Sequence, residues 1–279
     1  MKAKEKHVGT KAQIRAMKEK ERRIATAIFL VFILLMVIFS SYFTYNFLNR
    51  PQNQTINPTS NPESPQPKAI IFDQLSLTFP NQTFVQTATN ILTTANYTVY
   101  YYEGNQVTVD LYRSLPARGY SLIVLRVHAA LGAAEQPPVA LFTAEPYSNT
   151  RYVPEQLNDQ LIKVAYGIVG QEISYYFAIW PNFVKYSMNG KFQNTTIIMM
   201  GCDGFKYMHM AEAFIEKGAK AYISWNSKVS ASHTDPATIQ LLKQLITEKQ
   251  TIKQAIAETM EEVGPDPSYQ SILCSLGAK

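Results

Sequence analysis

Two residue types that can carry out nucleophilic catalysis follow two apolar runs of the sequence. The run at residues 122–127 is followed by His128, and the run at residues 197–200 is followed by Gly201 and Cys202. A thiol with a pKa of about 8.5 is mostly protonated at neutral pH, so an imidazole that accepts its proton makes it a better nucleophile. The pair predicts a His-Cys dyad for acyl transfer, with the backbone N–H groups of Ala129 and Cys202 as oxyanion donors.

The cysteine lies in a predicted strand-turn-helix unit. Residues 197–200 are apolar without alternation, which is typical of a strand buried on both faces. Gly201 and Gly204 flank the turn, where we expect positive φ angles and close backbone approach, and residues 207–217 predict the following helix. Such a turn presents its side chains at the carboxyl edge of a sheet, where open α/β sheets bind ligands.

The rest of the chain predicts the scaffold for this edge. Apolar runs and helical periodicities alternate, which indicates an α/β fold with a mainly parallel sheet and helices on both faces. Asp235 is the expected N-cap of the helix at 236–246. Residues 139–143 and 173–179 predict further strands, as a hairpin excursion, with a helix at 154–169 between them. The other expected strands are 69–72, 97–102, 121–127, 197–200, 221–225 and 271–276, and the other expected helices are 84–95, 109–115 and 252–263.

An apolar stretch near the start predicts one membrane anchor at residues 24–46, because a run of about 20 apolar residues can cross a bilayer. A signal peptide is the alternative, but no small-residue cleavage site follows. Residues 1–23 hold nine Lys or Arg and three Glu, so this tail is expected in the cytoplasm and the rest outside. Residues 47–68, rich in Pro and Asn, predict a linker to one extracytoplasmic domain at 69–279.

The charge of the chain is concentrated in that tail. After residue 23 the sequence holds 17 basic and 18 acidic residues, so no basic patch predicts a nucleic-acid partner. The expected partners are the membrane, through one helix, and a polypeptide substrate or protein partner. Glycosylation sequons begin at Asn53, Asn81, Asn96 and Asn194, all on the expected outward side, which agrees with an extracellular glycoprotein.

Cys202 also has a structural alternative. An exported chain with two cysteines predicts a disulfide between Cys202 and Cys274. Cys274 stands in an apolar run, however, where a free cysteine behaves as a small hydrophobic residue. We expect His209 to be a surface or packing residue. His233 is expected in the turn at a helix start, and it has no cysteine or second histidine at ligand spacing, so no metal site is expected. No cofactor is expected either.

The ordered pair, a buried strand ending in His and a later one ending in small-Cys before a helix, resembles the caspase-like cysteine peptidases. The tract at residues 213–223 makes the resemblance more specific. Together with several positions that follow it, this tract is similar to the CHAT and clostripain-gingipain branches. The resemblance covers about residues 69–246 and implies a three-layer caspase-like fold, with His128 as general base and Cys202 as nucleophile. The matching positions after the tract are Trp225, Val229, Asp235, Ala237 and Thr238.

The sequence departs from this family at one position. The family has Gly after its catalytic His, whereas this chain has Ala129, which leaves a catalytically inactive binding or scaffold domain as the alternative to a peptidase. If the chain is a peptidase, four residues are expected to line its substrate pocket, where an acidic group would favour Arg or Lys. Asp203 is alternatively a turn residue that caps the next helix. The four are Asp203, Trp225, Asn226 and Glu145.

Overall fold

The computed structural model describes residue 36 and residues 66–133, 135–166 and 173–277. The described residues from 66 onward belong to one unit of the fold, Ser64–Lys279. The predicted tail (1–23), anchor (24–46) and linker (47–68) lie outside the described residues, apart from Met36 and residues 66–68. Within the described ranges, no helix combines the length and the apolar character needed to cross a membrane.

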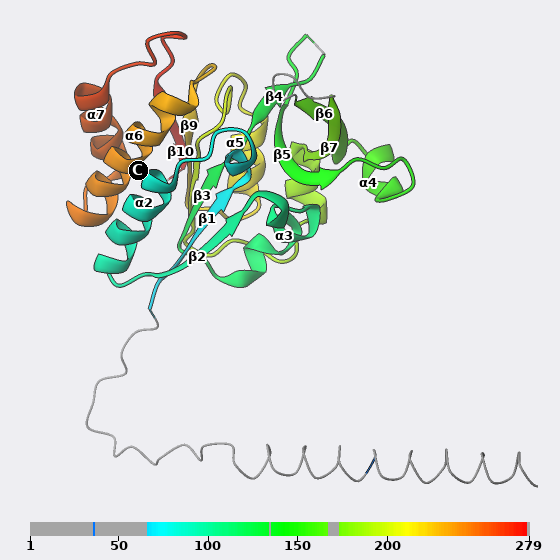
Figure 1. The fold of residues 1–279 in the computed structure, drawn as a ribbon, viewed down its shortest axis with the longest axis horizontal. Coiled ribbons are helices and arrows are strands. Elements are labelled where there is room, and N and C mark those ends of the chain that lie inside the picture. The colour runs from blue at the N-terminus through cyan, green and yellow to red at the C-terminus, as the bar shows by residue number, and fades with distance from the viewer. Residues whose placement is uncertain (1–35, 37–65, 134, 167–172, 278–279) are drawn as a thin grey trace, which may run out of the picture. The chain divides into compact units, whose positions relative to one another are not determined.

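The main element is a six-stranded sheet in the order β10-β9-β8-β3-β1-β2. Its first five strands in the chain pair in parallel, and only β10 is antiparallel, against β9 (Figure 1). The predicted α/β fold with a mainly parallel sheet is therefore confirmed. The strands are β1 Lys68–Asp73, β2 Thr98–Glu103, β3 Leu122–Arg126, β8 Thr196–Met199, β9 Ala221–Trp225 and β10 Leu273–Gly277.

Helices pack on both faces of this sheet, because successive residues of its central strands point to opposite faces and both faces are apolar. Along β1, Ile70 and Phe72 belong to the core on one face, and Ala69 and Ile71 to the core on the other. Helices α3 Val109–Ser114 and α5 His209–Glu216 cover the first face. Helices α2 Gln82–Thr94, α6 Ala231–Leu242 and α7 Ile252–Val263 cover the second (Figure 1).

Local sequence explains where the helices on the second face begin. The Asn81 side chain accepts a hydrogen bond from the Phe84 N–H and so caps α2. Thr251 and Gln254 form a reciprocal capping box at the start of α7, whose bounds match the predicted helix. Helix α6 differs from the prediction, because it begins at Ala231 rather than at Pro236 and is followed by a π-helical turn, Lys243–Thr247.

A second, antiparallel sheet is inserted between β3 and β8, in the order β4-β5-β7-β6. Its strands are β4 Ala129–Leu131, β5 Val139–Pro146, β6 Leu161–Tyr166 and β7 Ser174–Ile179. The expected strands at 139–143 and 173–179 are thus present. The expected helix at 154–169 is wrong, because only α4 Val153–Leu157 is helical and β6 follows it. In β6 the side chains alternate between partly buried and exposed, which is the period of a strand.

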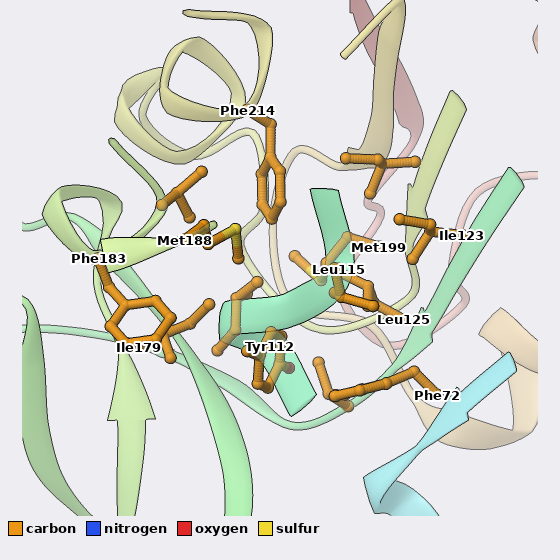
Figure 2. Packing of buried hydrophobic residues seen from close by; sticks show 14 of the residues in the cluster. Phe72, Tyr112, Leu115, Ile123, Leu125, Ile179, Phe183, Met188, Met199 and Phe214 are labelled. Atoms are coloured by element: carbon orange, nitrogen blue, oxygen red, sulfur yellow. The ribbon is translucent and has the colours of Figure 1, made fainter. Parts of the chain in front are cut away.

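The core on the first face joins the two sheets. Figure 2 shows Phe72, Leu125 and Met199 of the main sheet in the same cluster as Ile179 of β7 and Phe183. The second sheet is therefore packed onto the main one, and β4 continues directly from the end of β3 at the carboxyl edge.

Candidate active site

His128 and Cys202 lie at the carboxyl ends of neighbouring strands. Leu125 of β3 pairs with Met199 of β8, and His128 and Cys202 each follow three residues later. Both line one cavity of about 370 Å³. The other residues of its lining are Leu75, Phe79, Val127, Met200, Gly201, Val229, Ser230, Ala231, Ser232, Thr234 and Tyr269.

The glycines of the cysteine turn allow close packing rather than unusual dihedral angles. Neither Gly201 nor Gly204 has a positive φ, so that part of the prediction is wrong, and it is Asp203 between them that has a φ of 59°. A Cβ on Gly201 would lie 2.4 Å from the carbonyl oxygen of Val127 and 3.1 Å from the Cβ of Ala129. The absence of a side chain at Gly201 therefore lets the turn after β8 contact the segment that carries His128.

Cys202 is a partly buried free thiol. Its Sγ lies 3.5 Å from the carbonyl oxygen of Val229, to which it donates. Burial raises the pKa of the Cys202 thiol above its usual range, so the resting group is protonated at neutral pH. Cys274 is also free and lies on β10, opposite Ser224 of β9, so the structure contains no disulfide between Cys202 and Cys274.

His128 is held by hydrogen bonds at its ring and its backbone. Nε2 lies 2.9 Å from the Thr78 hydroxyl, and the His128 N–H donates to Oε1 of Gln74 at 2.9 Å. The ring stacks on Tyr166 at a centroid distance of 5.4 Å and meets Phe79 edge-on at 6.0 Å. Burial, together with the positive charge of Arg126, lowers the pKa of His128 to about 4, so its imidazole is neutral at neutral pH.

The contacts of Thr78 bear on which ring nitrogen is free. The Thr78 hydroxyl also lies 3.5 Å from the carbonyl oxygen of Leu75, which can only accept. When the hydroxyl donates there, it accepts from Nε2–H of His128, and Nδ1 is the unprotonated nitrogen.

The two expected oxyanion donors differ in their surroundings. The Phe142 N–H donates to the His128 carbonyl at 3.0 Å, and Ala129 pairs with Leu141 in the ladder between β4 and β5. Hydrogen-bonded and non-bonded pairs alternate in an antiparallel ladder, so the N–H of Ala129 points away from β5. The N–H of Cys202 has no acceptor among residues 66–133, 135–166 and 173–277. Among the described residues, neither N–H has an acceptor.

None of the four residues expected in a substrate pocket lines the cavity of His128 and Cys202. Glu145 lies on β5, where it accepts hydrogen bonds from the Val109 N–H and the Tyr152 hydroxyl, both at 3.0 Å, and pairs with Arg151. Glu145 therefore lies away from this cavity, on the second sheet, where its carboxylate binds the first N–H of α3.

The other three have structural partners near the ends of β8 and β9. Trp225 is buried in the core and donates from Nε1 to the Thr234 hydroxyl at 2.9 Å. The Asn226 side chain accepts from the Ile272 N–H at 3.0 Å and so ties β9 to the segment before β10. Asp203 is buried in the turn after β8, and its carbonyl accepts from the Lys206 N–H at 3.0 Å. Burial raises the pKa of Asp203.

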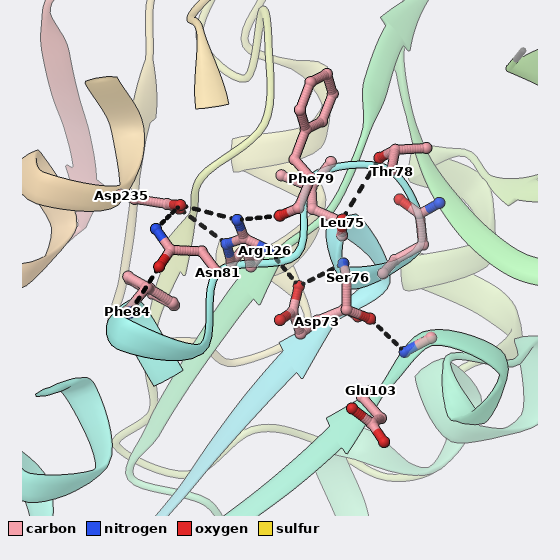
Figure 3. A network of polar contacts seen from close by, with 12 residues as sticks. Asp73, Leu75, Ser76, Thr78, Phe79, Asn81, Phe84, Glu103, Arg126 and Asp235 are labelled. Carbon is pink, nitrogen blue, oxygen red and sulfur yellow. Dashed lines mark hydrogen bonds and ion pairs between the residues drawn. The ribbon is translucent and has the colours of Figure 1, made fainter. Parts of the chain in front are cut away.

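Sequence reasoning missed a buried ion cluster beside the cavity. The Arg126 guanidinium contacts Asp235 from Nε and Nη2, both at 2.8 Å, and Asp73 from Nη1 at 2.7 Å (Figure 3). Nη2 also donates to the carbonyl of Phe79 at 2.8 Å. Asp235 is therefore a buried partner of Arg126 inside α6, and the expected N-cap role is wrong. The signal was an arginine in the otherwise apolar run at 122–127, because a buried charge requires a partner.

The sequons fall into two structural classes. The Asn81 amide is used twice, since Oδ1 accepts from the Phe84 N–H and Nδ2 donates to Asp235 at 2.8 Å. Asn96 and Asn194 are exposed in turns before β2 and β8, both with positive φ, at the edge of the sheet opposite to His128 and Cys202. Asn53 lies outside the described residues.

Within the described ranges, no group of three or more His, Cys, Asp or Glu side chains is placed to hold a metal ion. Comparison of the sequence with models of known protein families finds no match, and no curated protein matches it. The chemistry of the site is therefore inferred from its own residues.

Proposed function

We propose that this chain is a cysteine peptidase in which His128 is the general base and Cys202 the nucleophile. The observation that carries the proposal is the single cavity lined by both side chains at the ends of β3 and β8. A nucleophile and a base in one cavity, with free backbone N–H groups beside them, are the parts that acyl transfer requires.

The reaction follows from the protonation states. The neutral imidazole of His128 accepts the Cys202 proton as Sγ attacks the peptide carbonyl, and a C–S bond forms. The N–H groups of Ala129 and Cys202 stabilise the oxyanion. His128 then returns the proton to the leaving amine as the C–N bond breaks. A water molecule, deprotonated by His128, cleaves the thioester and restores the thiol.

Thr78 and Gln74 are the positioning residues in this proposal. Thr78 fixes the ring through Nε2, and Gln74 fixes the backbone of His128 through its N–H. Both belong to the segment after β1, so the residues that follow β1 position the base that follows β3. The resemblance to the caspase-like clan belongs to the same proposal, and it is supported by the mainly parallel sheet with His128 and Cys202 after adjacent strands.

The test compares purified full-length wild type with Cys202→Ala, His128→Ala and the double variant on a panel of peptides. Each single change is expected to abolish most cleavage. The double change is expected to lower the cleavage rate little further, because the two groups act as a unit. Cys274→Ala is the matched control and is expected to retain activity. Undiminished cleavage by Cys202→Ala would overturn the peptidase proposal.

A catalytically inactive binding module is the second candidate, and a specific observation favours it. Burial raises the pKa of the Cys202 thiol and lowers that of His128 to about 4, so the resting pair is not ionised. Ala129 also replaces the glycine expected from the resemblance. Absence of cleavage by every form, wild type included, would favour this candidate. A large gain in turnover from Ala129→Gly would indicate an impaired peptidase.

We also propose that the domain is anchored to the cell membrane by residues 24–46 and faces the extracytoplasmic side. The support is the apolar run after a basic tail. Protease added to intact cells is expected to release the large domain. A domain that is protected in intact cells but digested after lysis would overturn this topology.

A further inference from the structure

The cavity of His128 and Cys202 has an uncharged and largely apolar lining. Among residues 66–133, 135–166 and 173–277, no Asp, Glu, Lys or Arg side chain contributes to it, and the imidazole of His128 is neutral at neutral pH. Its walls come from the segment after β1, the turn after β8 and the start of α6. The apolar part of the lining consists of Leu75, Phe79, Val127, Met200, Val229, Ala231 and Tyr269.

Two charged groups near the cavity, Arg126 and Asp266, are paired with protein groups. Arg126 is fully buried between Asp73 and Asp235. Asp266 accepts hydrogen bonds from the Ser230 N–H and hydroxyl at 2.9 and 2.6 Å, and from the Ser268 and Tyr269 N–H groups at 2.8 and 2.9 Å. A charged side chain that entered the cavity would lose part of its hydration, and the lining formed by the described residues offers it no charged partner.

The start of α6 does not provide an anion site. Its N-terminal N–H groups would favour a negative ligand if they were alone. The carboxylate of Asp266 already binds the N–H of Ser230, the residue that precedes α6, and places a negative charge at this end of the helix. An acidic ligand would therefore be repelled by Asp266.

Two half-exposed aromatic side chains from different loops line the cavity. Phe79 is 52% exposed and Tyr269 is 48% exposed, although both side chains are large and apolar. The Phe79 carbonyl is fixed by Nη2 of Arg126, and Figure 3 shows its ring pointing away from that ion cluster. The Tyr269 N–H is fixed by Asp266 at 2.9 Å. Half-exposed aromatic rings on anchored backbone can form the contact surface for a ligand.

On the basis of the proposed function, we propose that the cavity takes an uncharged apolar or aromatic side chain, that of the peptide residue whose carbonyl Cys202 attacks, and holds it between Phe79 and Tyr269. The volume of about 370 Å³ lies at the lower end of the range for ligand pockets, about 300–1,000 Å³, which suits one large side chain with its adjoining backbone. Peptides with Leu or Phe at this position are the expected ligands. Arg, Lys, Asp and Glu are expected to be excluded.

The test measures binding apart from turnover. Full-length Cys202→Ala protein is titrated into fluorescent peptides that differ only at one central residue, which is Leu, Phe, Arg, Lys, Asp or Glu. The Leu and Phe peptides are expected to bind at least tenfold more tightly than the four charged ones. Adding Phe79→Ala or Tyr269→Ala is expected to remove most of this difference. Adding Tyr186→Ala, at a 73% exposed aromatic outside the cavity lining, is expected to leave it unchanged.

The outcomes separate this inference from the proposed function. Equal or tighter binding of a charged peptide, no measurable binding of any peptide, or discrimination that survives both aromatic changes in a folded protein would overturn the inference. Cleavage by wild type only after charged residues would support the peptidase and also overturn the inference. Tight binding of the Leu and Phe peptides without cleavage by wild type would support the inference and count against the peptidase.

Discussion

The guanidinium of Arg126 binds both carboxylate oxygens of Asp235, with Nε and Nη2 each 2.8 Å from one oxygen. This pair joins the end of β3 to α6, and Arg126 also contacts Asp73 at the end of β1. Through Nη2 the same arginine holds the Phe79 carbonyl, so one buried cation organises the loop beside the cavity. Its position two residues before His128 also places positive charge close to the candidate base.

Breaking the Arg126–Asp235 pair is expected to destabilise the fold strongly. Asp235→Ala leaves a buried guanidinium with Asp73 as its remaining charged partner, and removal of one member of a buried pair costs about 3–5 kcal/mol. Urea unfolding followed by circular dichroism measures the loss. The control is Glu216→Ala, which breaks the more exposed pair with Lys185 and is expected to cost about 1 kcal/mol or less. Equal losses in the two variants would contradict the structural role of Arg126.

Gly201 is expected to tolerate no side chain. In Gly201→Ala the new Cβ would lie 2.4 Å from the carbonyl oxygen of Val127, and a backbone atom cannot rotate away as a side chain can. Overpacking of this kind costs about 1–3 kcal/mol, and here it would also separate the two turns that carry His128 and Cys202. We therefore expect lower thermal stability together with loss of peptide binding.

The control for this change is Gly132→Ala, where the nearest atom to the new Cβ is a ring carbon of Trp180 at 3.2 Å. This side chain can shift by a few tenths of an ångström, so the control is expected to be nearly neutral. A Gly201→Ala protein that melts and binds peptide like Gly132→Ala would show that the two turns do not need this close approach.

Much of the scaffold could be predicted because its signals are local. Helix α7 was predicted with its observed bounds, since its apolar residues recur at helical spacing. The proximity of His128 and Cys202 followed from a general property of parallel sheets, in which the carboxyl ends of neighbouring strands meet at one edge. Strand β6 was missed because its short alternating run follows Pro154, which fits the first turn of a helix equally well.

The parts that could not be predicted depend on pairings distant in sequence. Arg126 and Asp235 are 109 positions apart, and no local pattern specifies that partner. Phe79 and Tyr269 line the same cavity, although their two loops lie near opposite ends of the domain's sequence. Trp225 and Asn226 were expected at the pocket because they lie at the carboxyl end of β9, whereas their side chains form tertiary hydrogen bonds with Thr234 and Ile272.

The thiol of Cys202 is expected to react slowly at neutral pH. Burial raises its pKa, and only the thiolate is nucleophilic. The rate of alkylation by iodoacetamide, measured by mass spectrometry in a Cys274→Ser background, should therefore still be rising between pH 7 and pH 9. A rate that reaches a plateau below pH 7 would indicate a preformed thiolate-imidazolium pair and contradict the resting state described here.

The sequon at Asn81 is expected to remain unmodified in folded protein, whereas those at Asn96 and Asn194 are accessible. A glycan on Nδ2 of Asn81 would displace its hydrogen bond to Asp235, and α2 would lose part of its N-terminal support. Peptide mapping of protein secreted from a glycosylating host measures occupancy at each site. Full occupancy of Asn81 in protein with an unchanged melting temperature would contradict this contact.

The fold is expected to lose stability as His128 is protonated. The pKa of His128 is about 4 in the folded chain, against about 6.5 for an unperturbed histidine, so between these values the unfolded chain binds more protons than the folded one. The contribution of neutral His128 to the free energy of unfolding is therefore fully present above about pH 6.5. It decreases by up to about 3 kcal/mol as the pH falls towards 4. Guanidinium unfolding at pH 7, 6, 5 and 4.5 measures the slope. The His128→Gln variant should show a smaller dependence of stability on pH than wild type, since all other titrating groups are common to both proteins. The control His209→Gln, at an exposed histidine, should leave this dependence unchanged. Equal slopes in wild type and His128→Gln would show that the imidazole is not buried in its neutral form.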